Sequence, residues 1–303
     1  MRYPEKLKKG DTVGLVCTSS PIKTERIEKC REAVENLGFK VKMADNLDAK
    51  FNGYMAGSGR ERAKWLNTMF EDPEVKGIFC IRGGDGSSRI MEYLDYEMIK
   101  NNPKVFAGYS DVTNLHLAFN KKCDFVTYHG PMVSSNMADG FDNESERAFI
   151  EAVCSEEPYE FKNPEGYIIG VINEGHAEGR ITGGNLSLLS ASIGTPYEID
   201  TRDSILFIEE VGEPMSKIEK WIYHLRNTGK FNDCKGVILG QFTNVTNEEC
   251  PDLDADEYIG NILKEYNIPV MCNIQSGHGD KMITMPMGAE CIMDTASLKI
   301  SFK

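Results

Sequence analysis

The feature that most constrains the fold is an alternation of short apolar runs with helix-like segments along residues 1–135. Apolar runs with the length of a buried strand occur at residues 13–17, 77–81, 105–107 and 125–128. Between them, apolar residues recur at helical spacing, as they do from Ile27 to Leu37. Strands that alternate with helices in this way predict a parallel sheet with helices on both faces.

The chain changes character after residue 135. From residue 136 to residue 166 the periodicity weakens and Gly, Pro, Asn and Glu accumulate, which indicates a connection between domains. Residues 167–303 are richer in short strand-like runs and contain one strongly amphipathic helical segment, at residues 214–227. We therefore expect an α/β domain over residues 1–135 and a smaller β-rich domain, α+β or barrel-like, over residues 167–303.

Composition narrows the class of protein. The 303 residues include 47 Asp and Glu against 34 Lys and Arg, which gives a formal net charge of −13 at pH 7. A chain this acidic repels phosphate backbones and anionic lipid, so we expect neither nucleic-acid binding nor membrane binding. No stretch approaches the roughly 20 apolar residues that a membrane-spanning helix requires. The sequence is typical of a globular protein, with 41% hydrophobic and 27% charged residues.

Cysteine usage and the first residues indicate a compartment. Nine cysteines are scattered without a C-x-x-C pair, and several, such as Cys17 and Cys80, stand among apolar neighbours. Reduced thiols of this kind are typical of a reducing compartment. The start, MRYPEKLKKGD, has no apolar segment behind its charges, so no secretory signal is visible. We expect the protein in the cytoplasm.

The most informative local segment surrounds Ser110. An apolar strand at residues 105–107 ends in a sharp turn that contains Ser110, and a helical segment begins at once. This arrangement resembles the nucleophile elbow, in which a strand-to-helix turn exposes a serine hydroxyl at the carboxyl edge of a sheet. It departs from G-x-S-x-G because Val112 stands where the second glycine would be. The alternative is that Ser110 or Asp111 only caps the helix.

A Gly-rich turn from Arg82 to Ser88 also follows a buried strand and precedes a helical segment. It is not G-x-G-x-x-G, and the chain contains no P-loop Gly-Lys-Ser/Thr. Such a turn presents backbone N–H groups that can hold an anion or an oxyanion. The alternative is a tight turn with no role beyond the fold.

Among the five histidines, His278 is the best general-base candidate, because two glycines flank it in a loop and leave its ring accessible. His129 and His176 lie in turns and are weaker candidates, whereas His116 fits a packed core and His224 a helix surface. Neither H-E-x-x-H nor paired Cys/His spacing occurs, so we expect no metal site.

Three acidic residues, Glu209, Glu210 and Glu213, follow the strand-like run at residues 204–208. Carboxylates at the carboxyl end of a strand are well placed to orient a histidine, although a solvated strand end explains them equally well. Strand alternation puts Glu209 and Glu210 on opposite faces without showing which one faces inward.

Taken together, these residues resemble the serine LD-carboxypeptidase family, which includes muramoyltetrapeptide carboxypeptidases and microcin C self-immunity peptidases. The resemblance runs nearly end to end and rests on the order and spacing of several segments. These are Ile81-Arg82-Gly83-Gly84, Gly108-Tyr109-Ser110-Asp111-Val112-Thr113, Tyr128-His129-Gly130-Pro131, Gly183–Leu189, Leu206–Glu213, and Gly277-His278-Gly279 before Pro286-Met287-Gly288.

The resemblance implies a metal-independent serine carboxypeptidase with no cofactor. Ser110 would be the nucleophile, His278 the general base and acid, and Glu209 the residue that orients the imidazole. The backbone N–H groups of Gly84 and Asp111 would form the oxyanion hole. The family's fold is a flavodoxin-like amino domain joined to a smaller β-rich carboxyl domain of swivelling or barrel-like form, and its members are commonly homodimers.

A carboxypeptidase must also recognise a free α-carboxylate, which an acidic protein repels unless positive potential is concentrated locally. Arg82, Arg89 and the helix N-terminus at Asp111 are candidates, although each arginine can instead serve a structural ion pair. Gly83 and Asp85 on the same turn are further substrate-binding candidates. Asp85 stands where the family often has an aromatic or another residue, and it brings a negative charge to the turn.

The substrate implied by the resemblance is a small peptide. We expect release of the terminal D-alanine from L-centred murein tetrapeptides during cytoplasmic peptidoglycan recycling. The alternative within the family is cleavage of a peptidyl- or aminoacyl-nucleotide amide, as in microcin C self-immunity. A distant alternative from another class is a nucleotide- or flavin-binding module that uses the Gly-rich turn, but no dinucleotide fingerprint supports it.

Overall fold

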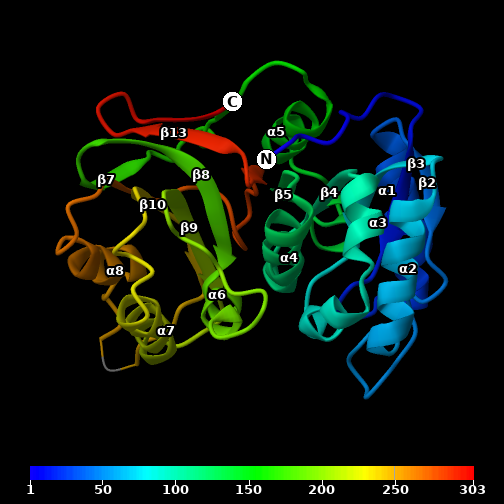
Figure 1. The fold of residues 1–303 in the computed structure, drawn as a ribbon, viewed down its shortest axis with the longest axis horizontal. Helices are drawn as coiled ribbons and strands as arrows, with labels where there is room; N and C mark the ends of the chain where they lie inside the picture. Colours follow the sequence, from blue (N-terminus) through cyan, green and yellow to red (C-terminus); the bar gives the residue numbers. More distant parts are fainter. Residues whose placement is uncertain (249) are drawn as a thin grey trace. The chain divides into compact units, whose positions relative to one another are not determined.

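The chain folds into two units, Met1–Glu156 and Glu157–Lys303, in a computed structural model that describes residues 1–248 and 250–303 (Figure 1). The stretch 136–166, which we expected to be a connection, instead contains helix α5 (Asn143–Cys154) and strand β6 (Tyr159–Phe161). The helix belongs to the first unit because Phe149 packs edge-on against Phe79 of the sheet, with ring centroids 5.1 Å apart.

The first unit is built on a parallel sheet, as the sequence predicted. Its strands are β1 (Thr12–Val16), β2 (Lys40–Met43), β3 (Val75–Cys80), β4 (Val105–Gly108) and β5 (Thr127–His129). Within this unit they pair in the order β2-β1-β3-β4-β5, all parallel. This is the flavodoxin-like order, and its switch point lies between β1 and β3, where such sheets bind ligands at the carboxyl ends of the strands.

Helices alternate with these strands. They are α1 (Ile27–Asn36), α2 (Gly59–Glu71), α3 (Tyr96–Asn101), α4 (Thr113–Cys123) and α5. Short turns η1 (Thr24–Arg26), η2 (Ser87–Arg89), η3 (Met91–Tyr93) and η4 (Ser110–Val112) and a π-helical segment η5 (Val133–Met137) complete the unit. Phe70 of α2 contacts Phe106, Phe119 and Phe125, so one aromatic cluster joins two helices to the sheet.

A buried arginine ties together loops at the carboxyl ends of the strands. Arg62 on α2 is only 1% exposed. Its guanidinium donates to the carbonyl oxygens of Thr18 after β1, Gly57 before α2 and Gly86 after β3. Burial lowers the pKa of Arg62, and the charge of Asp111 opposes that change. A cation that is satisfied mainly by backbone carbonyls fixes those loops relative to one another.

Replacing Arg62 with alanine should therefore destabilise the protein. The change leaves buried carbonyls without donors, so we expect the free energy of unfolding to fall on the order of 3 kcal/mol or more. Urea denaturation measures this. The control is Arg60→Ala on the same helix, because Arg60 is exposed and stacks over the Tyr93 ring at 4.5 Å, which is worth about 1 kcal/mol or less. Equal losses from the two variants would contradict the role of Arg62.

The second unit is β-rich and mixed. Its further strands are β7 (Gly170–Asn173), β8 (His176–Asn185), β9 (Ser204–Val211), β10 (Gly236–Thr243), β11 (Val270–Cys272), β12 (Met285–Met287), β13 (Glu290–Asp294) and β14 (Lys299–Phe302). Eight strands pair in the order β6-β14-β13-β8-β9-β10-β11-β7. The central run from β8 to β11 is parallel and the outer pairs are antiparallel. Its helices are α6 (Leu186–Ser192), α7 (Met215–Asn227) and α8 (Ala255–Leu263), so the expected β-rich α+β unit is confirmed.

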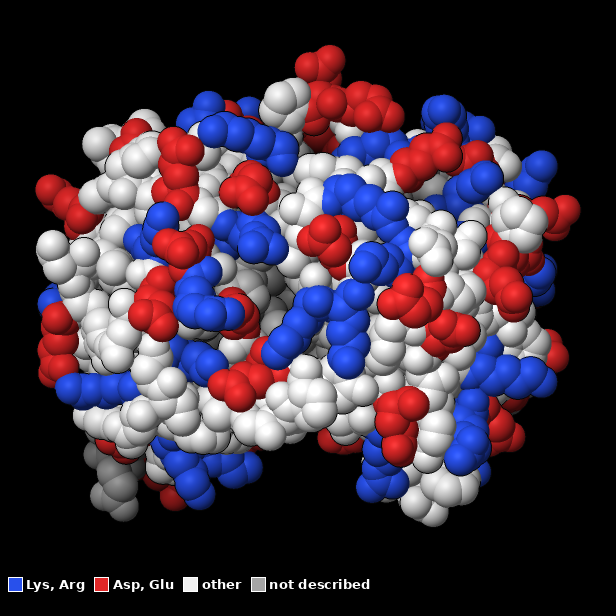
Figure 2. Space-filling view, viewed as in Figure 1, with Lys and Arg blue, Asp and Glu red and all other residues white. Residues whose placement is uncertain are grey.

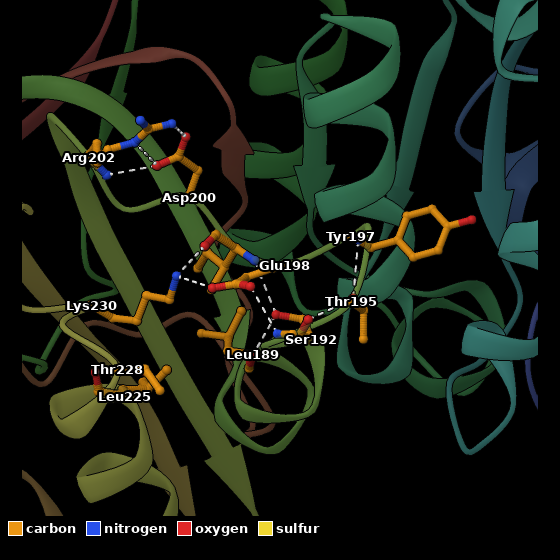
Figure 3. A network of polar contacts seen from close by, with 12 residues as sticks. Leu189, Ser192, Thr195, Tyr197, Glu198, Asp200, Arg202, Leu225, Thr228 and Lys230 are labelled. Carbon is orange, nitrogen blue, oxygen red and sulfur yellow. Dashed lines mark hydrogen bonds and ion pairs between the residues drawn. The ribbon is translucent and has the colours of Figure 1, made fainter.

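Figure 3 shows the connection that leads from α6 into β9, the strand that carries Glu209 and Glu210 near its end. Ser192 Oγ donates to the Leu189 carbonyl (2.7 Å) and accepts the Ile199 N–H (3.2 Å). Lys230 Nζ donates to Glu198 Oε1 (2.6 Å) and to the Ile199 carbonyl (3.0 Å). These bonds hold the connection in one conformation where the chain enters β9.

On the face shown in Figure 2, Lys and Arg side chains are interspersed with Asp and Glu over most of the surface. No helix within residues 1–248 and 250–303 has the length and apolarity needed to cross a membrane.

Candidate functional site

The turn that follows β4 holds Ser110 in an unusual conformation. Ser110 has φ 63°, in the left-handed region that non-glycine residues rarely adopt. Gly108 permits the close approach before it, because a Cβ there would lie 2.9 Å from Cys80 Cβ and 3.1 Å from the Val112 side chain. The N-cap residues of η4 and α4 are Tyr109 and Val112, and the Asp111 carboxylate bonds Ser19 and Ser87 outside the helix. The geometry thus favours a nucleophile elbow over a simple N-cap.

The Gly-rich turn lies directly against Ser110. A Cβ at Gly83 would be 3.0 Å from Ser110 Cβ and 3.1 Å from Ser110 Oγ. Gly84 (φ 115°) and Gly86 (φ 113°) adopt left-handed conformations, and a Cβ at Gly84 would overlap Ser20 Oγ at 2.1 Å. Gly83 lets the backbone of this turn approach the Ser110 hydroxyl closely, and such an approach is what backbone oxyanion donors require.

The other candidates on this turn are exposed. Arg82, Asp85 and Arg89 point into solvent, and Arg82 makes one long bond to the Pro21 carbonyl, at 3.4 Å. Neither arginine has a carboxylate partner within ion-pair distance among the described residues, so the structural ion-pair alternative gains no support. Arg82 and Arg89 both remain candidates for binding an anionic group of a substrate.

Two histidines of the first unit are buried. His116 is 1% exposed, with Nε2 bonded to the Gly108 carbonyl (2.8 Å) and Nδ1 to Thr127 Oγ1 (2.9 Å). Burial lowers the pKa of His116 to about 4, so the ring is neutral and structural, as predicted. His129 was expected in a turn, and this is wrong: it is the last residue of strand β5 and has no exposed surface.

Glu209 and His278 are in direct contact within the second unit. Glu209 lies on β9 with no exposed surface, and its Oε2 accepts the His278 Nδ1–H at 2.7 Å. Gly277 (φ 146°) lets the loop approach, because a Cβ there would lie 3.2 Å from Glu209 Oε2. A hydrogen bond from Nδ1–H fixes the tautomer and leaves the lone pair on Nε2, the form that a general base needs.

The environment sets the proton affinity of His278. Burial lowers its pKa, but the charge of Glu209, the hydrogen bond to it and the charge of Glu210 raise it more, so the pKa lies above the ordinary value. A carboxylate that stabilises the imidazolium in this way matches the role of the acid in a catalytic triad.

Glu210 faces the other side of β9. Its carboxylate accepts hydrogen bonds from Asn185 Nδ2 and the Ser187 N–H, both at 2.8 Å, and burial raises its pKa. The two neighbouring glutamates therefore serve different elements: Glu210 anchors the start of α6, and Glu209 holds the histidine.

Sequence reasoning missed Gln241, which organises the His278 loop. The β9–β10 register shifts here, so that Gly240 and Gln241 stand opposite the single residue Glu209. Gln241 Oε1 accepts the Gly279 N–H at 2.8 Å, and Nε2 donates to Gln275 Oε1 (2.9 Å) and the Lys281 carbonyl (3.1 Å). Gln241 therefore bonds residues of this loop both before and after His278.

Gln241→Ala should lower activity more than stability. The loop keeps its glycines but loses the acceptor that fixes Gly279, so His278 samples positions away from Glu209 and kcat falls on the order of tenfold to 10²-fold. Steady-state kinetics with thermal denaturation measures both effects. Gln275→Ala is the matched comparison, because it removes one partner of Gln241 and keeps the bond to Gly279. A full kcat in Gln241→Ala would contradict the assignment.

No group of three or more His, Cys, Asp or Glu side chains in the described part of the chain is arranged to hold a metal ion. The expectation that the protein has no metal site remains a prediction.

Comparison with known proteins places this arrangement in a family. Residues 13–130 match the LD-carboxypeptidase N-terminal domain and residues 178–293 match the LD-carboxypeptidase C-terminal domain. The probable murein peptide carboxypeptidase of Bacillus subtilis (strain 168) is 34% identical, over 97% of this chain and 92% of that protein. The microcin C7 self-immunity protein MccF of Escherichia coli is 28% identical, over 96% of this chain and 93% of that protein.

A solved structure of a related protein has the same fold. MccF with aspartyl sulfamoyl adenosine superimposes with a TM-score of 0.92 at 25% identity, covering 100% of this chain and 98% of that one. The class defined by fold and sequence is therefore a two-domain α/β peptidase. This chain belongs to the LD-carboxypeptidase family, and the resemblance drawn from its sequence is confirmed.

Proposed function

We propose that this protein is a serine carboxypeptidase that removes the terminal D-alanine from L-centred murein tetrapeptides. The observation that carries the proposal is the buried Glu209 carboxylate bonded to His278 Nδ1 at 2.7 Å. Ser110, held at φ 63° beside Gly83, supplies the nucleophile. In this proposal the three side chains act as a Ser-His-Glu triad.

In the first step, Ser110 Oγ attacks the carbonyl carbon that precedes the terminal residue, and His278 Nε2 takes the hydroxyl proton. The C–N bond then breaks, and His278 gives the proton to the amine of the leaving D-alanine. In the second step, water attacks the ester on Ser110 and His278 accepts its proton. His278 returns that proton to Ser110 Oγ as the peptide leaves.

Charge on the attacked carbonyl oxygen needs donors that are already in place. The backbone N–H groups of Gly84 and Asp111 fill this role in the proposal. Support comes from the close packing of the Gly-rich turn on the Ser110 side chain and from the position of Asp111 directly after the nucleophile. Arg82 or Arg89, both exposed and without a carboxylate partner among the described residues, then attracts the substrate's α-carboxylate.

The choice of murein peptide over nucleotide conjugate keeps the expectation drawn from the sequence, and relatives named for each of the two activities match this chain. The Bacillus subtilis relative named for murein peptide is 34% identical, whereas MccF is 28% identical. Both reactions break an amide with the same triad, and they differ in the pocket that receives the leaving group. A microcin C-type self-immunity peptidase is therefore the second candidate, because MccF matches over nearly the whole chain.

Mass spectrometry of products separates the two candidates. Purified protein is given murein tetrapeptide and, in a separate reaction, processed microcin C. We expect release of D-alanine from the tetrapeptide. Cleavage of the nucleotide conjugate with an untouched tetrapeptide would establish the second candidate, and a bound flavin spectrum with neither reaction would point to the binding-module alternative.

The cytoplasmic location and the homodimer belong to the same proposal. A cytoplasmic enzyme meets murein peptides that have been taken up for reuse, and the nine free cysteines suit a reducing compartment. Light scattering on the purified protein tests the dimer, and a mass near 33.9 kDa, that of one chain, would contradict it.

A further inference from the structure

Asp111 has a side chain that the proposed mechanism does not use. Asp111 directly follows Ser110 and is only 5% exposed. One oxygen, Oδ2, accepts both the Ser19 hydroxyl (2.5 Å) and the Ser87 N–H (2.8 Å). Burial raises the pKa of Asp111, and these hydrogen bonds oppose the change. Burying a carboxylate costs free energy unless hydrogen bonds compensate for the lost solvation. The partners of Asp111 therefore indicate what its burial serves.

The bonds between Asp111 and Ser87 are reciprocal. The Ser87 N–H donates to the Asp111 carboxylate, and the Ser87 hydroxyl donates to the Asp111 carbonyl oxygen at 2.6 Å. Asn114 Nδ2 donates to the Ser87 hydroxyl at 2.9 Å, which orients it. Residue 111 is thus joined at two points to Ser87, near the end of the Gly-rich turn.

These two residues belong to the two segments that carry the proposed oxyanion donors. The Asp111 N–H directly follows the nucleophile, and the Gly84 N–H lies on the same Gly-rich turn as Ser87. Gly84 and Gly86 restrict the backbone of that turn less than other residues would, so bonds from outside the turn contribute to holding it. Arg62 holds the Gly86 carbonyl at 2.9 Å, and the Asp111 carboxylate holds the next residue.

We propose that the Asp111 side chain is a positioning residue that fixes the spacing between the two oxyanion donors through Ser87. The inference rests on the proposed function, since it requires Ser110 chemistry with a backbone oxyanion hole. It differs from a purely structural role because the effect is specific to the transition state: the donors are present in every variant and only their separation changes. Misplacement of about 1 Å in such a site costs on the order of 10²-fold in rate.

Three substitutions test this proposal. Asp111→Ala removes the tie, and we expect kcat to fall on the order of 10²-fold with little change in KM. Asp111→Asn restores most of the activity, because both described donors bond one oxygen and the asparagine carbonyl can accept both. Ser87→Ala removes the hydroxyl bond to the Asp111 carbonyl and the bond accepted from Asn114, but it keeps the Ser87 N–H bond to the carboxylate, so we expect an intermediate loss.

A matched control exists in the same unit. Asp142 caps α5, and its Oδ2 likewise accepts one serine N–H (2.9 Å) and one serine hydroxyl (2.5 Å), both from Ser145. Asp142→Ala therefore removes the same two kinds of bond and should lower the melting temperature while leaving kcat unchanged. Each variant is measured in the full chain, for turnover of whichever of the two candidate substrates the wild type cleaves and for thermal unfolding.

The outcomes separate this inference from the proposed function. An active Ser110→Ala variant defeats the proposed function itself. If Ser110→Ala is inactive but folded Asp111→Ala keeps the wild-type kcat, only the inference is overturned. A loss in Asp111→Asn as large as in Asp111→Ala would also overturn it, because asparagine preserves the tie. Should Asp111→Ala fail to fold, Ser87→Ala decides: a lower kcat at unchanged KM supports positioning, and an unchanged kcat refutes it.

Discussion

Replacing Ser110 with alanine should lower kcat by at least about 10³-fold while the protein remains folded. The substitution deletes one hydroxyl and leaves the strained backbone of the elbow intact, since alanine has the same Cβ. Binding of substrate should persist, because the Gly-rich turn and the exposed arginines are unchanged. Product formation measured by mass spectrometry, with circular dichroism to verify the fold, checks the expectation.

The control for this variant is Ser297→Ala. Ser297 is exposed on the turn between β13 and β14 and donates only to Asp294 Oδ2 (2.6 Å) among the bonds described for its side chain. It should turn over substrate like the wild type. EDTA should leave the activity of both wild type and control unchanged. Strong inhibition by EDTA, or a Ser110→Ala enzyme with near-normal turnover, would rule out the serine mechanism.

Local patterns predicted the sheet but not all of its helices. Apolar runs of strand length and helical spacing between them are short-range signals, so the parallel sheet of residues 1–135 could be read directly. The helix α5 was missed because its polar flanks resemble a linker. Its apolar face, formed by Phe149, Ala152 and Val153, has meaning only against the sheet on which it packs.

The site residues also fall into those that a local sequence pattern marks and those that only the folded structure identifies. Turn chemistry marks Ser110 and His278, since a strand-to-helix turn and flanking glycines are visible in the sequence. The choice between Glu209 and Glu210 depends on which face of β9 meets the histidine loop, and strand alternation does not contain that information.

Gln241 gave no local signal at all. It acts on Gly279, 38 residues further along the chain, and its side chain would be ordinary at the end of any strand. The Asp111 carboxylate is a similar case, because Ser19 and Ser87 lie 92 and 24 residues away. Side chains that position other groups are found from the folded contacts, whereas residues in special turns are found from the sequence.

Glu209→Gln should reduce kcat roughly 10²–10⁴-fold and shift the pH dependence of what remains. Glutamine has the same shape but no charge, so it neither stabilises the imidazolium nor favours the Nδ1–H tautomer as strongly. The control is Glu213→Gln, which removes a nearby carboxylate that pairs with Lys217 (2.8 Å) and should leave kcat unchanged. Equal effects from the two variants would deny Glu209 a specific role.

The direction of the pH shift follows from the pKa of His278. Only neutral His278 can take the proton of Ser110, so activity rises with pH through the pKa of this histidine. The Glu209 charge raises that pKa against the effect of burial. Removing the charge lowers it, and the acidic limb of the kcat/KM profile should therefore move to lower pH in Glu209→Gln.

The same pKa has a consequence for stability. A histidine whose pKa is raised in the folded state adds stability that is fully present below its unfolded value, about 6.5, and is lost as the pH rises through the folded value. Urea denaturation at several pH values measures this effect. The free energy of unfolding of the wild type, relative to that of Glu209→Gln, should decrease as the pH rises over this window. A difference that does not change with pH, together with an unmoved acidic limb, would show that Glu209 does not tune His278.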